Sequence, residues 1–331
     1  MLRGTRNPGR TFSARLRRAL DLGFLSLTLV VALGILALLS AFIIVLFRAA
    51  DLSIVHYGLA LLGESTWAPG VNKLGLLPFI VGTLLTSAIA LVIAIPFSLG
   101  IAVSLSELAP RWIAEPLGYI VELLAAVPSV VFGLWGIFVL IPFMRTTIDP
   151  LLESWNNGAD RLFHASIPLF TGPISGSGVL TASIVLAIMI IPTISAISRE
   201  ALRAVPETQR EAALGLGATR CETTRMSVLS YARIGIVGAI ILGLGRAVGE
   251  TMAVTLVIGN SDFLPTSLFS QGQTIASLIA NEFLSNASSP LAASAFLYAA
   301  LVLLLITLLI NIGARLLVYR LVKRTGGGAI E

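Results

Sequence analysis

Two charged side chains, Arg246 and Glu250, interrupt an apolar stretch that runs from Ile234 to Ile258. An arginine stays protonated at any relevant pH and presents a planar fork of donors, which can hold two oxygens of an oxyanion. A glutamate four residues later is expected one helical turn away on the same face. Its carboxylate can neutralise the empty site, or accept a hydrogen bond from a protonated anion, which fully ionised sulfate cannot offer. The pair therefore predicts an anion relay, in which Arg246 attracts the anion and Glu250 releases it.

Small residues share this predicted helix face, namely Ala239, Gly243, Gly249 and Ala253. Such a stripe is typical either of close helix packing or of the wall of a narrow polar path. Arg246 is the thirteenth of the 25 residues in the stretch, a depth at which a charged side chain costs about 2.5 to 3.5 kcal/mol to insert in a membrane. A structural ion pair buried between helices is the alternative to a path, and the residue pattern leaves both open.

The composition requires a membrane for these residues. The 331-residue chain is 56% apolar and 12% charged, with a mean hydropathy of +0.95, so its polar residues cannot cover a water-facing surface. A membrane-spanning helix needs about 20 apolar residues, and six stretches qualify. They are Leu22–Phe47, a segment between Lys73 and Glu107, Leu117–Met144, Gly178–Ser198, Ile234–Ile258 and Leu291–Ile312. The predicted fold class is an all-α integral membrane protein with about six transmembrane helices.

The basic residues indicate how the spans are oriented. Of the 22 Lys and Arg residues, 17 fall before the first span, after the last, or in the alternate loops between, and only four fall in the opposite loops. The positive-inside rule then predicts that both termini are cytoplasmic. The first apolar run is too long for a cleaved signal peptide. We therefore predict a basic tail at 1–21, an anchor helix at 22–48, a transmembrane domain at 74–314 that includes a cytoplasmic loop at 199–230, and a tail at 315–331.

Residues for other chemistry are few. The single cysteine, Cys221, allows no disulfide within the chain. His56 and His164 have no Cys or carboxylate neighbours at metal-ligand spacing. Neither Lys73 nor Lys323 ends a phosphate-binding G-x-x-x-x-G-K-[ST] loop. The sequence therefore predicts no catalysis, no metal and no bound cofactor in this chain.

The loops between the spans differ in character. In the cytoplasmic loop, good helix formers from Glu207 to Leu214 follow Pro206 and precede Gly215 and Gly217, which predicts a short helix parallel to the membrane. The opposite loops, at about 49–73, 145–177 and 259–290, are longer than ordinary connections. They could carry short helices and dock an external partner, or they could be solvated connectors, and the sequence leaves both open.

The cytoplasmic loop resembles the E-A-A-x3-G-x9-I-x-L-P loop of the membrane subunits of bacterial ABC importers. In that family the loop forms a coupling helix that lies in a groove of the ATPase. Ser227 and Ser230 depart from the pattern, standing where Ile and Pro are usual. The resemblance implies a coupling role for the four matching residues, Glu211, Ala212, Ala213 and Gly217.

Four further segments resemble the PstC-type permeases of bacterial high-affinity phosphate importers. They are ELLAAVPSVVFGLWG at 122–136, LAIMIIPTISAISRE at 186–200, LGLGRAVGETMAVTLVIGN at 242–260 and QTIASLIANEF at 273–283. The PstA-type sister subunit typically continues Gly-Glu-Thr with Ala-Pro, whereas this chain continues with Met-Ala-Val. The resemblance implies the fold of a type I ABC importer permease (MetI-like) in the bacterial inner membrane. It also implies phosphate import, with Arg246 and Glu250 in the substrate pathway.

The same resemblance implies partners. A PstA-type permease would complete a heterodimer, two copies of a PstB-type ATPase would use ATP and Mg, and a PstS-type binding protein would deliver phosphate. An ABC permease for sulfate or molybdate is the main alternative. A secondary transporter is less favoured, because such folds commonly contain two similar halves and no convincing internal repeat relates 22–144 to 178–312. The coupling-loop pattern and the Arg-Ala-x-Gly-Glu-Thr block also disfavour a membrane scaffold or sensor.

Overall fold

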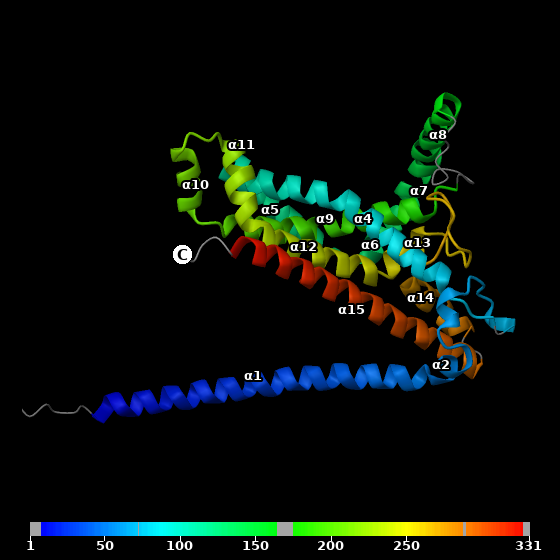
Figure 1. Ribbon diagram of the computed structural model, residues 1–331, viewed down its shortest axis with the longest axis horizontal. Coiled ribbons are helices and arrows are strands. Elements are labelled where there is room, and N and C mark those ends of the chain that lie inside the picture. Colours follow the sequence, from blue (N-terminus) through cyan, green and yellow to red (C-terminus); the bar gives the residue numbers. More distant parts are fainter. Residues whose placement is uncertain (1–7, 72, 164–174, 287–288, 327–331) are drawn as a thin grey trace, which may run out of the picture.

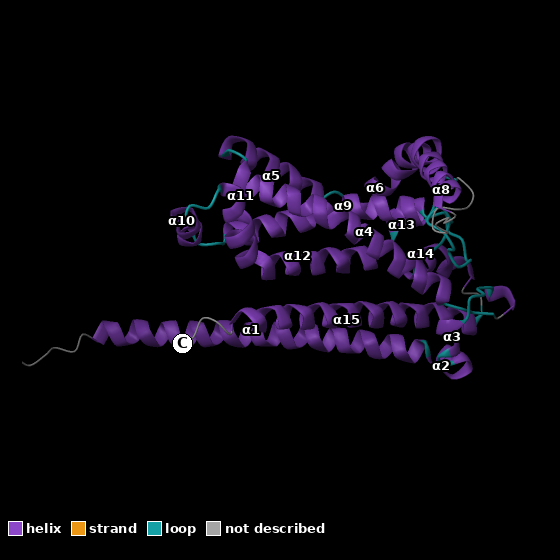
Figure 2. Cartoon of the chain, turned by 45° about the horizontal axis from the view of Figure 1, so that its top comes forward, coloured by secondary structure: helices purple, strands orange, loops and turns teal. Residues whose placement is uncertain are grey.

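The computed structural model describes residues 8–71, 73–163, 175–286 and 289–326, and within these ranges the regular elements are helices (Figures 1 and 2). Six helical segments are long and apolar enough to cross a membrane, which confirms the predicted all-α class and number of spans. They are Asp21–Ala49, Leu77–Leu108, Ser129–Asn156, Val179–Arg203, Arg220–Gly249 and Pro290–Leu316.

Helix α9 (Val179–Arg203) is the centre of the bundle and contacts α4 (Leu77–Val103), α5 (Arg111–Ala125) and α12 (Leu229–Gly249). Of its most apolar 18-residue window, 61% is buried, against 6% for the window of the first span. Because small residues line the α9–α12 contact, the two backbones approach closely. A methyl group added at Gly235 would lie 2.5 Å from the Ala201 side chain.

A cluster of aromatic rings closes one end of the bundle, which we call the α14 end. The Trp67 ring packs edge to face against Phe79 and Phe296, with ring centroids 5.4 and 5.2 Å apart. The surrounding elements are α2 (Asp51–Tyr57), α3 (Ala60–Gly63), α14 (Ile275–Asn286) and α15 (Pro290–Gly326). Of the two possibilities that the sequence leaves open for these long loops, the structure shows short helices.

The opposite end, which we call the α10 end, contains α10 (Glu207–Gly215) and α11 (Arg220–Glu222). The predicted short helix from Glu207 is confirmed. Beneath it, buried side chains form a separate apolar cluster that includes Ala102 of α4, Leu202 of α9 and Ile236 of α12, together with Val205 and Val228 from the segments beside those helices. The two ends lie at opposite extremes of the bundle in Figure 1.

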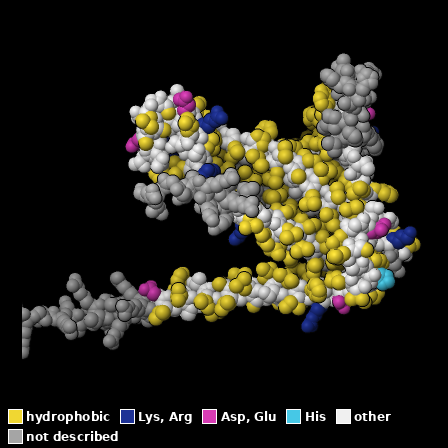
Figure 3. Space-filling model, in the orientation of Figure 1, with side chains coloured by type: hydrophobic (Ala, Val, Ile, Leu, Met, Phe, Trp, Pro, Cys, Tyr) yellow, Lys and Arg dark blue, Asp and Glu magenta, His cyan; other side chains and the backbone are white. Residues whose placement is uncertain are grey.

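Helix α1 (Pro8–Ala49) projects beyond the bundle, beside α15 (Figure 2). Its apolar side chains from Leu22 onward are almost all exposed, and hydrophobic side chains also cover the bundle in Figure 3. Such a surface suits lipid. Helix α1 begins inside the predicted 1–21 tail and α15 ends inside the predicted 315–331 tail, so those tails are partly helical.

Two predicted spans are not single helices. The third, expected at 117–144, is broken at Ala126–Pro128 between α5 and α6 (Ser129–Trp135). Proline lacks the N–H that a helix needs, and it disfavours helical backbone at the residue before it. The span then continues through π-helical turns and α7 (Ile141–Phe143) into α8 (Asp149–Phe163). The fifth span, expected at 234–258, starts earlier and ends at Gly249.

Candidate functional site

The Arg-Ala-x-Gly-Glu-Thr block forms a helix break, so the prediction that Arg246 and Glu250 share one continuous helix face is wrong. Helix α12 ends at Gly249, Glu250 has extended backbone (φ −69°, ψ 129°), and a new helix, α13 (Met252–Val257), follows. The Glu250 carboxylate accepts a hydrogen bond from the Ala253 N–H at 3.2 Å. Glu250 therefore satisfies one of the free N–H groups at the start of α13, as a capping side chain does.

Arg246 lies in the last turn of α12 and reaches two other helices. Its Nη1 donates to the Ala125 carbonyl at 3.3 Å and to Thr193 Oγ1 at 3.1 Å. Ala125 is the last residue of α5, so its carbonyl receives no hydrogen bond from an N–H group of that helix. The C-terminal dipoles of α5 and α12 both favour a cation here. Arg246 therefore joins the central helices at the level of the α5–α6 break.

Both Arg246 partners are neutral. None of the ion pairs among the described residues includes Arg246 or joins it to Glu250. Within the same ranges, Arg246 Nε and Nη2 donate to no protein acceptor, and neither atom is fully buried without a partner. The edge of the guanidinium that suits bidentate recognition of an oxyanion is consequently available.

The stripe of small residues is divided between packing and exposure. Ala239 and Ala253 are fully buried, and Gly243 is buried against Ile194, whose side chain would lie 2.6 Å from a methyl group added at Gly243. Gly249, in contrast, is exposed and has nothing within 4 Å of its side-chain position. Most of the stripe therefore packs within the chain, and only its Gly249 portion faces open space.

A second arginine lies on α9, one turn from that helix's end. Arg199 is 6% exposed and forms an ion pair with Glu122 on α5, whose side chain is 45% exposed. The guanidinium occupies the space where residue 118 would carry a side chain, because a methyl group at Gly118 would lie 1.6 Å from Arg199 Nη1. The sequence predicts this residue in a cytoplasmic loop and misses the pair, since Glu122 is 77 positions away.

The matching residues of the coupling-loop pattern lie together at the α10 end. Glu211 and Ala212 are exposed, whereas Ala213 is half-buried. Gly217 has φ +87°, its N–H donates to Leu214 O at 2.9 Å, and the Ala218 N–H donates to Ala213 O at 3.2 Å. This pattern is a Schellman motif, which requires left-handed backbone at the glycine. Gly217 therefore ends α10 because glycine adopts left-handed backbone without strain.

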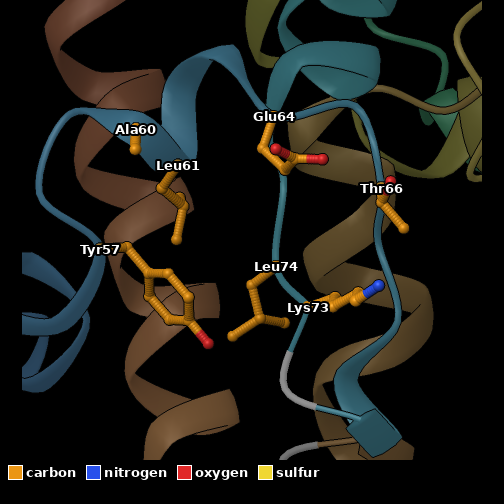
Figure 4. A pocket seen from close by; sticks show the side chains of 7 residues that line it. All are labelled: Tyr57, Ala60, Leu61, Glu64, Thr66, Lys73 and Leu74. Atoms are coloured by element: carbon orange, nitrogen blue, oxygen red, sulfur yellow. The ribbon is translucent and has the colours of Figure 1, made fainter.

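Polar groups also gather at the α14 end, away from Arg246. A pocket of about 360 Å³ lies between α2, α3 and the 64–74 segment. In Figure 4, Tyr57, Leu61 and Leu74 lie together, while the Glu64 and Lys73 side chains both extend to the right, away from Tyr57. Its full lining is Tyr57, Ala60, Leu61, Glu64, Thr66, Lys73 and Leu74. Arg246 and Glu250 do not line this pocket.

A carboxyl pair, Asp262 and Glu282, lies nearby. The Gln273 amide is buried and donates to Asp262 Oδ1 at 3.1 Å and to Glu282 Oε1 at 3.3 Å in the orientation that its hydrogen-bond network favours. Trp67 Nε1 donates to the other Glu282 oxygen at 3.0 Å. Burial, followed by the negative charge of Glu282, raises the pKa of Asp262 to about 6.

The metal-ligand candidates remain apart. Across the described ranges, no three His, Cys, Asp or Glu side chains gather as a metal ion would require. Cys221 is exposed at the α10 end, His56 lies in α2, and His164 lies outside the described residues.

Comparison with known proteins identifies relatives over nearly the whole chain. Residues 94–326 match the family of "binding-protein-dependent transport system inner membrane component" proteins. The chain is 44% identical over 306 residues to the "phosphate transport system permease protein PstC" of Mesorhizobium japonicum, covering 92% of each chain. It is 44% identical over 307 residues to that of Pasteurella multocida, covering 93% of this chain and 94% of the relative. It is 47% identical over 238 residues to "PstC 2" of Mycobacterium tuberculosis, covering 70% of each.

The fold has a solved counterpart in an inward-facing structure of the MetNI methionine ABC transporter. The match has a TM-score of 0.55 and 17% identity, and covers 74% of this chain and 95% of that one. This identity supports the fold alone, and it confirms the expected permease architecture. The chain therefore belongs to the inner membrane components of binding-protein-dependent transport systems, among the PstC-type permeases.

Proposed function

We propose that the chain is one half of the membrane permease of an ABC importer for inorganic phosphate. Two curated relatives that this chain matches over more than 90% of their length are phosphate transport permeases by name. A permease of this kind supplies the path, and a separate ATPase supplies the energy and uses ATP and Mg. The chain itself needs no bound cofactor for this role.

The single observation that carries the proposal is the state of Arg246. Its guanidinium is held by two neutral oxygens from α5 and α9, and its Nε and Nη2 donate to no described acceptor. A positive charge in an apolar bundle without a carboxylate partner attracts an anion strongly, because little water is present to screen it. The Nε–Nη2 edge matches the spacing of two phosphate oxygens.

Glu250 has a different proposed role from the one that a helical pair suggested. It holds the start of α13 by accepting from the Ala253 N–H, so it fixes the angle at which the chain leaves the Arg246 turn. A protonated phosphate oxygen can compete as a donor for the same carboxylate, whereas sulfate carries no such proton. Glu250 would thus favour phosphate over sulfate and release it toward the cytoplasm.

The remaining assignments follow from the family. A PstA-type permease would cover the exposed Gly249 portion of the stripe, and two PstB-type ATPases would dock on the α10 end through Glu211, Ala212, Ala213 and Gly217. A PstS-type binding protein would dock at the α14 end. With the basic residues cytoplasmic, the α10 end and both termini face the cytoplasm across a bacterial inner membrane.

Uptake by the reconstituted four-component complex tests the proposal. Arg246→Ala should lower ATP-dependent phosphate uptake by about 100-fold, the size of effect that follows loss of one preorganised anion donor. Glu250→Gln should lower phosphate uptake less and should weaken discrimination against sulfate in competition. The matched control is Arg48→Ala, which removes the same charge from an exposed position and should transport normally.

Two results would contradict this function. Wild-type uptake by assembled Arg246→Ala would remove the arginine from the pathway. Equal uptake of sulfate or molybdate by the wild-type complex would favour the alternative oxyanion permease.

A further inference from the structure

Arg210 on α10 joins three elements at one point. Its Nη2 donates to Glu107 Oε1 at 2.9 Å and its Nε to Glu107 Oε2 at 3.3 Å, a bidentate pair with the end of the second span. Nη1 and Nη2 also donate to the carbonyls of Val205 at 2.6 Å and Leu202 at 3.0 Å. The pair is mostly buried, with the Arg210 side chain 16% and the Glu107 side chain 10% exposed.

The carbonyl contacts explain why this position holds an arginine. Helix α9 ends at Arg203, where the Leu202 carbonyl accepts a long hydrogen bond from the Val205 N–H at 3.3 Å and can accept a second donor. A planar guanidinium can satisfy such carbonyls and a carboxylate at the same time, which a lysine ammonium cannot do in a fixed geometry. Hydrogen bonding to Glu107 raises the pKa of Arg210 further above its usual value.

The rest of α10 lies at the surface of the bundle. None of the α10 residues is buried. In addition to the Arg210 bonds, the Ser227 hydroxyl donates a hydrogen bond to the Gln209 carbonyl of α10 at 3.1 Å. Helix α10 also contacts the π-helical turns at Thr223–Val228, and Arg210 attaches it to the end of the second span and to the end of α9.

We infer that Arg210 is a positioning residue for transport, which transmits displacement of α10 by a docked ATPase to α4 and α9 through Glu107 and the Leu202 and Val205 carbonyls. Helix α9 also carries Thr193, which holds Arg246. Nine residues separate Thr193 from Leu202, about 14 Å along a rigid helix. Displacement of the α9 end by Arg210 would therefore also move Thr193 Oγ1, which accepts a hydrogen bond from Arg246. This inference rests on the proposed coupling of α10 to an ATPase.

Uptake per ATP hydrolysed, measured on the purified full complex in lipid, tests the transmission. Arg210→Ala should retain the ATPase subunits at the wild-type ratio and continue to hydrolyse ATP, while uptake per ATP falls about tenfold, within the range by which residues between two sites alter coupling. Arg210→Lys, which keeps the charge but not the fork, should fall in the same direction. The control Arg203→Ala removes an exposed charge at the end of α9, seven positions earlier, and should match wild type.

Unchanged uptake per ATP in assembled Arg210→Ala would overturn the inference, as would a defect confined to the amount of assembled complex. Should Arg210→Ala not assemble, Glu107→Gln serves instead. This variant leaves the two carbonyl contacts and removes only the charge of the partner. Wild-type uptake per ATP hydrolysed in Glu107→Gln would then overturn the inference.

A second measurement needs no substrate and so separates this inference from the proposed function. Spin labels are placed on exposed positions of α10 and α4, at Thr208→Cys and Phe97→Cys, with Cys221→Ser as background. With Arg210 present, the label distance should stay constant when ATP binds, because α10 and α4 move together. With Arg210→Ala it should change on ATP binding. A distance that responds equally in both would exclude the tether even if phosphate transport is established.

Discussion

At the scale of single residues, Arg246 is stabilised without being neutralised. The Ala125 carbonyl, Thr193 Oγ1 and two helix C-termini lower the cost of its charge, and each is a dipole rather than a full negative charge. A carboxylate partner would instead cancel the field that attracts an anion. The same reasoning separates Arg246 from Arg199, which is paired with Glu122 and mostly buried. Arg199 therefore suits packing of α5 on α9.

Asp262 gives a pH dependence at this scale. Its folded pKa of about 6 lies above the usual 3.8, so the folded chain binds this proton more tightly than the unfolded chain. The stabilisation is therefore complete below about pH 4 and is lost as the pH rises through about 6. Solvent screening of a partly exposed carboxyl reduces the effect to about 1 kcal/mol.

Hydrogen exchange of the 259–274 segment measures this effect. The protection of wild type relative to Asp262→Asn should fall between pH 5 and pH 7.5, because the asparagine needs no proton to bond Glu282. Taking the ratio at each pH removes the intrinsic pH dependence of exchange. A ratio that is constant or rises with pH would show that the pair does not share a proton.

At the scale of elements, the breaks in the helices decide what the site can do. The α12–α13 break turns Glu250 from a neighbour of Arg246 into a cap for Ala253. The α5–α6 break exposes the Ala125 carbonyl that Arg246 uses. Irregular backbone at membrane depth is tolerated where protein side chains satisfy it or where it lines a cavity. Arg246 lies at both breaks, since it belongs to the last turn of α12 and donates to the last carbonyl of α5.

The end of α10 provides a test at this scale. Gly217→Ala should lower the stability of the α10 end by about 1 to 2 kcal/mol, because an alanine resists left-handed backbone. It should weaken co-purification with the ATPase or the coupling of ATP hydrolysis to uptake. The control, Gly215→Ala, changes a glycine of the same helix with no positive φ and with nothing within 4 Å of its side-chain position. This control should behave as wild type, and equal behaviour of both variants would remove Gly217 from the docking surface.

At the scale of the whole molecule, charge and exposure are distributed between the two ends. The coupling-loop residues and Cys221 lie at the α10 end, whereas the carboxyl pair and the exposed Phe263 lie at the α14 end. Between them, the bundle surface in Figure 3 is largely hydrophobic. A chain of this shape places one end in each aqueous compartment, and the excess of basic residues predicts that the α10 end is the cytoplasmic one.

The single cysteine tests this orientation. A membrane-impermeant thiol reagent should label Cys221 in inside-out vesicles and leave it unlabelled in sealed right-side-out vesicles. The reciprocal variant, Cys221→Ser with Phe263→Cys, moves the thiol to a residue that is 80% exposed at the α14 end and should reverse the pattern. Labelling of Cys221 from outside would invert the assigned topology and with it the cytoplasmic coupling role of α10.

The sequence by itself determined the membrane class, the six spans and the short α10 helix that ends before Gly217, whereas the roles of Arg246 and Glu250 in transport stay predictions. Hydropathy, helix propensity and glycine backbone preference act over a few residues, so a linear reading detects them. Only the tertiary structure decided where the fifth span breaks and which oxygens hold Arg246. It also revealed that Arg210 binds Glu107. Those contacts join residues 53, 121 and 103 positions apart, and their geometry depends on how the helices pack. Spacing alone places Glu250 beside Arg246 only if the helix is unbroken. In the structure α12 ends at Gly249, and Arg246 donates to neutral oxygens of α5 and α9 instead.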